Sequence, residues 1–335
     1  MDFDLNEDQR EIKSVARELL GARSTWARVR AAAVAGEYDG PLWREVVELG
    51  WPGIAVSEEN GGQGLGIVEL AVLLEELGYA CAAVPFLSTA VAAAVIDRYS
   101  DGDLHEHLPG LLRGETRVGV GRAGLILDGA DGPAALLITD GRIIQVNSRR
   151  EVLVTIDPTR RFGRMVEGQP FAGGWNAHTG GDAAALLTTA VAAELVGVCQ
   201  RSLEMTLDYV KERRQFGVPV GSFQAVSHRC AEMLLHTESA RSTAYYAAWA
   251  ADAGVGGGVS LTEAAALAGA AAATGGREVA ASAIQAHGGI GFTWEADVHW
   301  LYKRAEVDRM LLGGSSVHHA TLARAAAARL AAMST

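Results

Sequence analysis

The sequence predicts a mainly α-helical protein with a small β domain in the middle of the chain, and three observations lead to this fold class. The first third carries apolar residues at the i, i+3 and i+4 spacing of amphipathic helices. From about Arg117 the pattern changes to short apolar runs separated by Asp-Gly and Asp-Pro, which is typical of strands joined by tight turns. From Ala183 onward long helical patterns with short connections return, which favours a C-terminal four-helix bundle. These changes divide the chain into domains at residues 1–116, 117–180 and 181–335.

The first helix is expected to start just after Asn6, which forms a capping box with Gln9. Further along, the stretch "SEENGGQGLG" contains a glycine cluster of the kind that can bind phosphate. No strand precedes this cluster, and Glu58 and Glu59 would repel an anion. We therefore expect a structural turn there.

The middle region predicts strands at Ala135–Thr139, Ile143–Val146 and Val152–Ile156, paired as a small antiparallel unit. The stretch "GGWNAHTGGD" is expected to be a linker. Among the helices that follow, one should begin at Ser260, which forms a capping box with Glu263. The last helix should begin near Ser315.

Composition narrows the class of protein. The formal net charge of −11 over 335 residues argues against a nucleic-acid binder, which needs a basic face. No uncharged apolar run is long enough to span a bilayer, and the acidic start lacks the order of a signal peptide. Three scattered cysteines fit neither a disulfide framework nor a metal site, and His105 with His107 lacks a third ligand. We therefore expect a cytoplasmic protein without a membrane segment, a nucleic-acid partner or a metal.

The segment "DYVKERRQFGVPVGSFQAVSHRCAEM" concentrates basic residues in this acidic chain and admits two interpretations. Lys211, Arg213 and Arg214 suit the C-terminal turn of a helix that Gly217 and Pro219 would end. Alternatively, a guanidinium here could bind an anion such as a phosphate through two parallel donors. The spacing alone is compatible with both.

A second motif, "AIQAHGGIGFTWEADVHWLYKRAE", follows the first in the bundle region. The two motifs in this order resemble the acyl-CoA dehydrogenase family. The N-terminal "LWREVVELGWPGIAVSEENGGQGLG" is similar to the helical domain of that family. The resemblance covers almost the whole chain except the β region. It implies FAD held between subunits and dehydrogenation of an acyl-CoA thioester, with a glutamate as the general base and the flavin as hydride acceptor.

The resemblance also implies a set of cofactor-binding residues. Arg213 would meet the pyrophosphate of an FAD that a neighbouring subunit holds, with Gln215 and Phe216 beside it. Gln224 would contact the same cofactor. The segment Gln285, Ala286, His287, Gly288 and Gly289 would surround its adenosine side, since glycines let the backbone approach closely.

The sequence departs from the family where the chemistry should occur. Gly313 stands in the turn "MLLGGSSV" where the glutamate is expected, and Leu187 stands at the alternative position for the base. Neither side chain can accept a proton, so we predict no catalytic residue in this chain. Glu194, on the same helix face as Leu187, could be a replacement base or an ordinary bundle residue. The middle region also lacks the segment with which the family holds the flavin ring.

These departures favour one function and leave two alternatives. The favoured function is a subunit of a heteromeric, FAD-dependent acyl-CoA dehydrogenase with the composition α2β2. In it, this chain supplies half of the FAD site to a full-length partner that carries the base and binds most of the acyl-CoA. The substrate would be bulky, such as a steroid side-chain acyl-CoA. The alternatives are a self-sufficient homo-oligomer with a relocated base and a flavin-free scaffold of the same fold.

Overall fold

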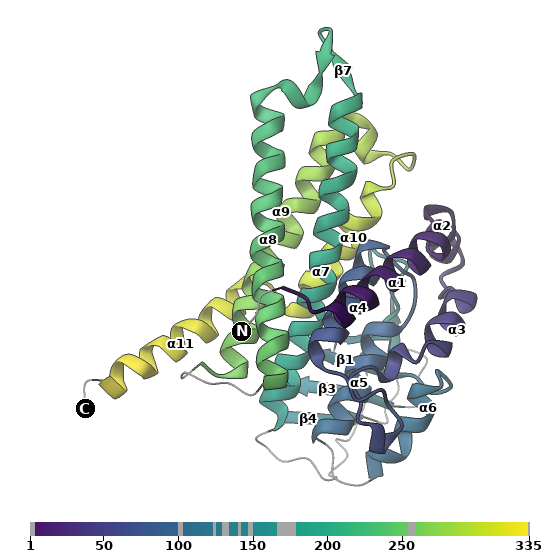
Figure 1. Cartoon of the computed structure of the whole chain (residues 1–335), viewed down its shortest axis with the longest axis vertical. Coiled ribbons are helices and arrows are strands. Elements are labelled where there is room, and N and C mark those ends of the chain that lie inside the picture. The colour runs from purple at the N-terminus through teal and green to yellow at the C-terminus, as the bar shows by residue number, and fades with distance from the viewer. Residues whose placement is uncertain are drawn as a thin grey trace.

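Helices α7 (Thr179–Glu212) and α8 (Gln224–Ala253) form a long pair that protrudes from the rest of the molecule (Figure 1). The computed structural model describes residues 4–99, 103–122, 125–128, 134–139, 142–146, 150–165, 179–253 and 259–333. Helices make up both ends of the chain, and the six-stranded sheet lies between residues 118 and 165. The predicted fold class is therefore confirmed. The domain boundaries at residues 116 and 180 stay predictions.

The N-terminal part is helical, and its first cap forms as the sequence predicts. The Gln9 amide donates to Asn6 Oδ1 at 2.8 Å, and the Asn6 amide donates to Gln9 Oε1 at 2.9 Å. The segment of the glycine cluster folds into turns closed by backbone hydrogen bonds such as Gly62 to Ser57 at 2.9 Å. The elements are α1 (Glu7–Arg23), α2 (Trp26–Ala35), α3 (Gly40–Glu48), α4 (Ile67–Tyr79), α5 (Phe86–Tyr99), α6 (Leu108–Leu112) and the 3₁₀ turns η1 (Trp51–Gly53), η2 (Glu58–Asn60) and η3 (Asp103–His107).

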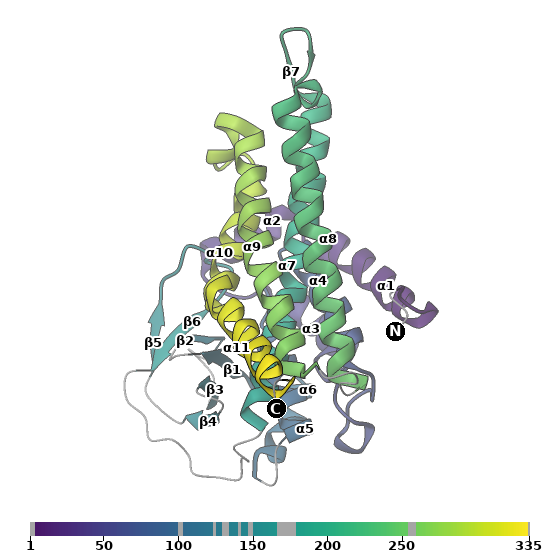
Figure 2. The same ribbon diagram turned by 90° about the vertical axis from the view of Figure 1, so that its left-hand side faces the viewer.

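The described strands of the middle region form one sheet in the order β4-β3-β1-β2-β6-β5. The sheet lies beside the base of the bundle (Figure 2). The expectation of a wholly antiparallel unit is wrong, because β1 and β3 run parallel on one side of the sheet while β2 pairs with the other edge of β1. The strands are β1 (Val118–Arg122), β2 (Leu125–Leu127), β3 (Ala134–Thr139), β4 (Arg142–Val146), β5 (Arg150–Leu153) and β6 (Phe162–Met165).

The predicted strand Val152–Ile156 is placed too far along the chain. The observed strand β5 ends at Leu153, and Val154 is fully exposed. Asp157 then turns the chain inward, because its Oδ1 accepts the Thr159 amide at 2.9 Å. This local turn outweighs the alternation of apolar residues on which the prediction depended.

The C-terminal helices assemble around α7, which packs against α4, α8 and α9. Helix α7 is long and apolar enough to cross a membrane by length and composition alone. However, 89% of its most apolar 18-residue stretch is buried inside the protein. The cap at Ser260 forms as predicted, with the Glu263 amide donating to Ser260 Oγ at 3.2 Å. The elements are α7 (Thr179–Glu212), β7 (Arg214–Gln215), β8 (Val218–Pro219), η4 (Val220–Ser222), α8 (Gln224–Ala253), α9 (Leu261–His287), η5 (Gly288–Phe292), α10 (Val298–Leu312) and α11 (Ser315–Met333).

A buried arginine joins the three parts of the chain. Arg304 of α10 is completely buried and donates to Asp157 Oδ2 at 2.7 Å and to Glu194 Oε1 of α7 at 3.0 Å. It also donates to Thr159 Oγ1 at 2.7 Å and to the Ala82 carbonyl at 3.3 Å. These partners come from the N-terminal part of the chain, the β region and the bundle, so one guanidinium contacts all three.

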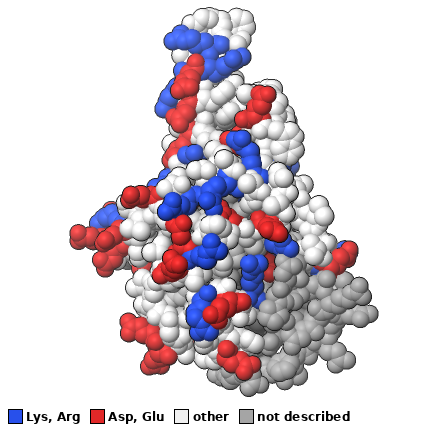
Figure 3. Space-filling view, turned by 90° about the vertical axis from the view of Figure 1, so that its right-hand side faces the viewer, with Lys and Arg blue, Asp and Glu red and all other residues white. Residues whose placement is uncertain are grey.

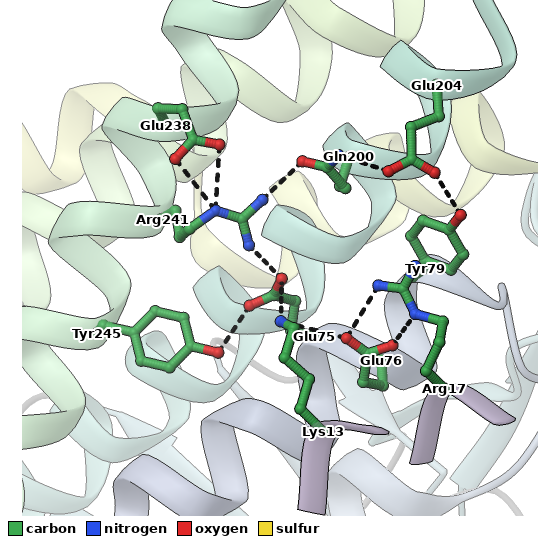
Figure 4. Close-up of polar contacts among 10 residues, drawn as sticks. All are labelled: Lys13, Arg17, Glu75, Glu76, Tyr79, Gln200, Glu204, Glu238, Arg241 and Tyr245. Carbon is green, nitrogen blue, oxygen red and sulfur yellow. Dashed lines mark hydrogen bonds and ion pairs between the residues drawn. The ribbon is translucent and has the colours of Figure 1, made fainter. Parts of the chain in front are cut away.

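A second polar network fastens the N-terminal helices to the bundle (Figure 4). The buried carboxylate of Glu75 on α4 accepts from Lys13 Nζ and from Tyr245 Oη, each at 2.7 Å, and pairs with Arg241 of α8. Burial raises the pKa of Glu75, but the charges of Arg241 and Lys13 outweigh burial and hold that pKa below its ordinary value. Glu75 is therefore ionised at neutral pH and can tie α1, α4 and α8 together.

Candidate functional site at the end of the bundle

The basic segment forms a hairpin at the protruding end of the bundle (Figure 1). Helix α7 ends at Glu212, so the interpretation as a helix end is confirmed. Strands β7 and β8 pair with Gln215 opposite Val218, which leaves a turn of only two residues. Both residues of the turn have positive φ, +50° at Phe216 and +82° at Gly217. This is the type I′ geometry that matches the twist of a hairpin.

Phe216 is an unusual choice for this turn. A side chain other than glycine or asparagine is strained in the left-handed region, and 93% of the Phe216 residue is exposed. Its ring contacts the protein edge-to-face at Phe223, with the ring centroids 6.3 Å apart. Strain combined with exposure is typical of residues that serve binding, and here it holds an aromatic ring away from the body.

The two adjacent arginines differ in what they contact. Arg214 Nη1 donates to the Gly217 carbonyl at 3.2 Å, so this side chain closes the hairpin. Arg213 is exposed, and among the described residues its side chain has no hydrogen bond or ion pair. Figure 3 shows Lys and Arg side chains gathered at this end of the molecule, where Lys211 is also exposed. Arg213 is thus the guanidinium that remains available to an anion.

The second motif lies beside the first. The imidazole of His287, at the end of α9, stacks on Tyr209 of α7 with the ring centroids 4.4 Å apart. Tyr209 lies one turn before Arg213, and its carbonyl accepts the Arg213 amide at 2.9 Å. The stack therefore brings together two segments that are far apart in the sequence. Sequence reasoning missed Tyr209, although its i, i+4 spacing from Arg213 was a usable signal.

The residues of the second motif face in different directions. Gln285 is exposed and Ala286 is partly exposed, whereas His287 is buried and bonds the Ala283 carbonyl through Nδ1 at 2.8 Å. Burial lowers the pKa of His287, so the ring is neutral and serves the packing. Gly288 has φ +63°, and no heavy atom lies within 4 Å of a Cβ built at Gly288 or Gly289. The backbone there faces open space that a ligand could approach.

Gln215 and Gln224 complete the predicted set. Gln215 ends β7 and is exposed, and Gln224 is the exposed first residue of α8. Together with Arg213 and Phe216 they line the end of the bundle from the hairpin side. The structure therefore brings the predicted cofactor residues to one end of the bundle, with His287 alone among them turned inward.

The turn before α11 holds no carboxylate. Gly313 ends α10 with φ +81°, a conformation in which a glutamate would be strained. Its neighbour Leu312 is buried, and the Leu312 carbonyl accepts from Arg122 Nη1 and His318 Nε2, both at 3.1 Å. Leu187 on α7 is also buried. No residue of this turn carries a carboxylate, whichever of them is compared with the base of the family.

Glu194 is not placed to be a replacement base. It is buried and bound by Arg160 and Arg304, the latter at 3.0 Å. Only 1% of Glu194 is exposed, so its carboxylate lies inside the bundle, away from any substrate at the surface. The interpretation of Glu194 as an ordinary bundle residue is confirmed.

No metal centre accompanies this arrangement in the described part of the chain, where no group of three or more His, Cys, Asp or Glu is placed to hold an ion. His105 bonds the Ile96 carbonyl at 3.2 Å. Cys81, Cys199 and Cys230 are buried and free.

Comparisons with known proteins agree with this architecture. Residues 6–115 match the family model described as the acyl-CoA dehydrogenase N-terminal domain, and residues 184–327 match the C-terminal domain. The acyl-CoA dehydrogenase IpdE2 of Mycobacterium tuberculosis is 31% identical over 91% of this chain and 93% of its own. The chain belongs to the acyl-CoA dehydrogenase family.

Two further members of the acyl-CoA dehydrogenase family are informative. FadE34 of M. tuberculosis is 34% identical over 90% of this chain, but the match spans only 46% of FadE34. A solved structure described as a variant of the Tcur3481-Tcur3483 steroid ACAD superimposes with a TM-score of 0.87. It is 27% identical and covers 97% of this chain and 99% of that one.

Proposed function

We propose that this chain is a subunit of a heteromeric, FAD-dependent acyl-CoA dehydrogenase and supplies half of the FAD site to a partner chain. The observation that carries the proposal is the end of the bundle. Two segments predicted to bind the cofactor meet there through the stack of Tyr209 on His287. The partner would hold the flavin ring and provide the general base.

The residues present fit such a cofactor. Arg213 is an exposed guanidinium without a partner in the described structure, which suits the two charges of a pyrophosphate. Gly288 and Gly289 leave open space where a side chain would lie, so backbone groups could approach a nucleotide. In the assembled site, FAD would accept the hydride from the acyl-CoA. The role of this chain would be to bind and orient the cofactor.

The lack of a general base at the positions where the family places it supports an enzyme built from two different subunits. Gly313, Leu312 and Leu187 offer no proton acceptor, and Glu194 is buried and paired with Arg160 and Arg304. A homo-oligomer of this chain would therefore contain the cofactor residues without the base. A complete enzyme then requires a second kind of chain, and we propose an α2β2 assembly in the cytoplasm.

The relatives support the partnership and suggest the substrate. The name Tcur3481-Tcur3483 joins two proteins and describes a steroid ACAD. FadE34 is about twice as long as the segment that matches this chain, which leaves room in one polypeptide for a second unit. We accordingly propose a bulky, steroid-derived acyl-CoA as the substrate class, bound mainly by the partner.

The proposal can be tested by comparing substitutions at the two neighbouring arginines, Arg213 and Arg214. Arg213→Ala should weaken FAD binding by the heteromer roughly ten- to a hundredfold, because a charge-assisted contact is worth on the order of 1.5–3 kcal/mol. Arg214→Ala is the matched control and should change affinity much less, since Arg214 closes the hairpin through Gly217. Titration of FAD into each apo-heteromer measures both. Equal, small effects would contradict the proposal.

A further inference from the structure

A cavity of about 270 Å³ lies where the end of α1 and the start of α2 meet α4 and α7. In the described part of the chain, its charged lining residues are Arg17, Glu76 and Arg201, and Trp26 and Tyr79 supply aromatic rings. At about 30 Å³ per water in the liquid, the volume corresponds to roughly nine water molecules. A compact organic molecule of about that many non-hydrogen atoms therefore fits.

On one side of this cavity, Arg17 is paired with a carboxylate of the protein (Figure 4). Arg17 Nη2 donates to Glu76 Oε1 at 3.0 Å, and Arg17 Nε pairs with the same carboxylate. The Arg17 guanidinium also lies over the ring of Tyr79, 3.4 Å from its centroid. Arg17 is therefore held in place, and its charge is already balanced by Glu76.

Arg201 of α7 is a second cation in the wall, and it has no such partner. Its Nη1 donates to Tyr79 Oη at 3.0 Å, and its guanidinium lies 5.0 Å from the ring centroid of Tyr79 and 5.8 Å from that of Trp26. Within the described structure Arg201 forms no ion pair, and its Nε and Nη2 make no hydrogen bond. Glu204, on the same helix, accepts instead from Tyr79 Oη and from Gln200 Nε2. Because Arg201 is partly exposed, a ligand in the cavity can reach its two unused donors.

The remaining walls suit the body of a small organic acid. Leu20 and the rings of Trp26 and Tyr79 provide apolar surface. Thr25 precedes α2, and its hydroxyl makes no capping hydrogen bond to that helix, so it is a further donor at the cavity. Apolar walls with a few polar groups that converge on one point are typical of sites for small molecules.

We propose that this cavity binds a compact organic carboxylate, with its two oxygens on the Arg201 guanidinium and its carbon skeleton against Trp26 and Tyr79. A guanidinium offers two parallel donors that match the two oxygens of a carboxylate. The single unpaired cation balances one negative charge, whereas a phosphate monoester carries about 1.5 to 2 charges at neutral pH. The inference goes beyond the proposed function, because none of the cavity residues belongs to the segments predicted to bind FAD.

The test is calorimetric titration of the full chain with benzoate, benzamide and inorganic phosphate. Benzoate carries a carboxylate on a ring that fits the cavity, and benzamide has nearly the same shape without the charge. We expect saturable binding of benzoate that is at least about tenfold tighter than that of benzamide. Arg201→Met should weaken benzoate binding about tenfold or more and leave benzamide binding unchanged. Arg201→Lys keeps the charge but not the fork, so its affinity for benzoate should lie between the two.

Further variants separate this inference from folding defects. Arg44→Met, at an exposed arginine of α3 outside the cavity, should bind benzoate like the wild type. Thr25→Val changes an exposed residue, so it should keep the thermal melting point and weaken benzoate binding about two- to fivefold.

Three results would overturn the inference. They are a wild-type chain that does not bind benzoate saturably, equal affinities for benzoate and benzamide, and unchanged benzoate binding by Arg201→Met and Thr25→Val. Tighter binding of phosphate than of benzoate would also overturn it, because the cavity would then select a different anion. None of these results bears on the proposed function, which is tested by FAD binding to the Arg213→Ala heteromer.

Discussion

At the scale of single residues, two buried aspartates, Asp128 and Asp308, have carboxylate oxygens without a hydrogen-bond partner in the described structure. Asp128 is completely buried, accepts from Ser88 Oγ at 2.7 Å and has its other oxygen without a partner in the described structure. Burial raises the pKa of Asp128 from 3.8 to about 7. Burial, followed by repulsion from Glu194, likewise raises the pKa of Asp308 well above its ordinary value. Both acids therefore carry protons in the folded protein under conditions where the unfolded chain releases them.

The raised pKa of Asp128 predicts a pH dependence of stability. The folded state keeps a proton that the unfolded state loses, so stability falls as the pH rises from 3.8 to about 7 and then levels off. Asp128→Asn removes this cost and suits the φ of +58°, which asparagine tolerates. The variant should be more stable than the wild type at pH 7.5 by on the order of 1–3 kcal/mol. Urea unfolding between pH 4 and 8 measures this. A difference that does not shrink toward pH 4 would contradict the assignment.

Residue-scale features divide into those that local sequence reveals and those that it cannot. The capping boxes at Asn6 and Ser260 were predictable, because both partners lie within four positions. The network of Arg304 was not, since Glu194 lies 110 positions away and Asp157 147 positions away. The roles of Arg213 and Arg214 could be distinguished beforehand only through the family resemblance. Their different contacts appear only in the folded hairpin.

At the scale of elements, α10 depends on Arg304 for its position. Arg304→Met should destabilise the protein by about 3–5 kcal/mol, because Asp157 would remain buried without its counter-charge and Glu194 would keep only Arg160. Arg309→Ala is the control on the same helix. Its partner Glu306 is three residues away and the pair is partly exposed, so the cost should be about 0–1 kcal/mol. Free energies of unfolding from urea titration compare the two. If the two variants lost similar amounts of unfolding free energy, the Arg304 network would not be what fixes the position of α10.

A substitution at Phe216, in the hairpin between α7 and α8, should affect protein stability and FAD affinity differently. Phe216→Asn places a residue that accepts positive φ at the turn, so stability should stay constant or rise by up to about 1 kcal/mol. If the exposed ring packs against the cofactor of the partner, FAD affinity of the heteromer should fall about two- to tenfold. Thermal melting and FAD titration on the same preparations give both values. A melting point that falls together with affinity would show that Phe216 serves the hairpin itself.

The boundaries and directions of some strands could not be predicted from the sequence pattern. The shift of the third predicted strand to Arg150–Leu153 follows from the turn at Asp157, whose buried carboxylate is held by a distant arginine. The parallel pair of β1 and β3 was not visible in the alternation of apolar residues, because alternation gives faces and not strand direction. The lengths of the helices were easier to predict, because long periodic segments depend on the local spacing of apolar residues.

At the scale of the whole molecule, membership of the acyl-CoA dehydrogenase family and the missing base point to an unequal partnership. The two segments predicted to bind the cofactor meet at one end of the bundle, while Gly313 and Leu187 stand where the family would place its base. On this account the chain serves the flavin of its partner and has none of its own. The alternatives of a self-sufficient homo-oligomer and of a flavin-free scaffold predict different flavin contents.

The flavin content of the assembled enzyme tests this claim most directly. The chain, affinity-tagged in its native cells, is purified with its partner, and FAD absorbance is compared with the amount of each polypeptide. We expect one FAD for each pair of unlike chains and no flavin on this chain purified alone. Two FAD for each pair, or stoichiometric FAD with turnover on the isolated chain, would contradict the account.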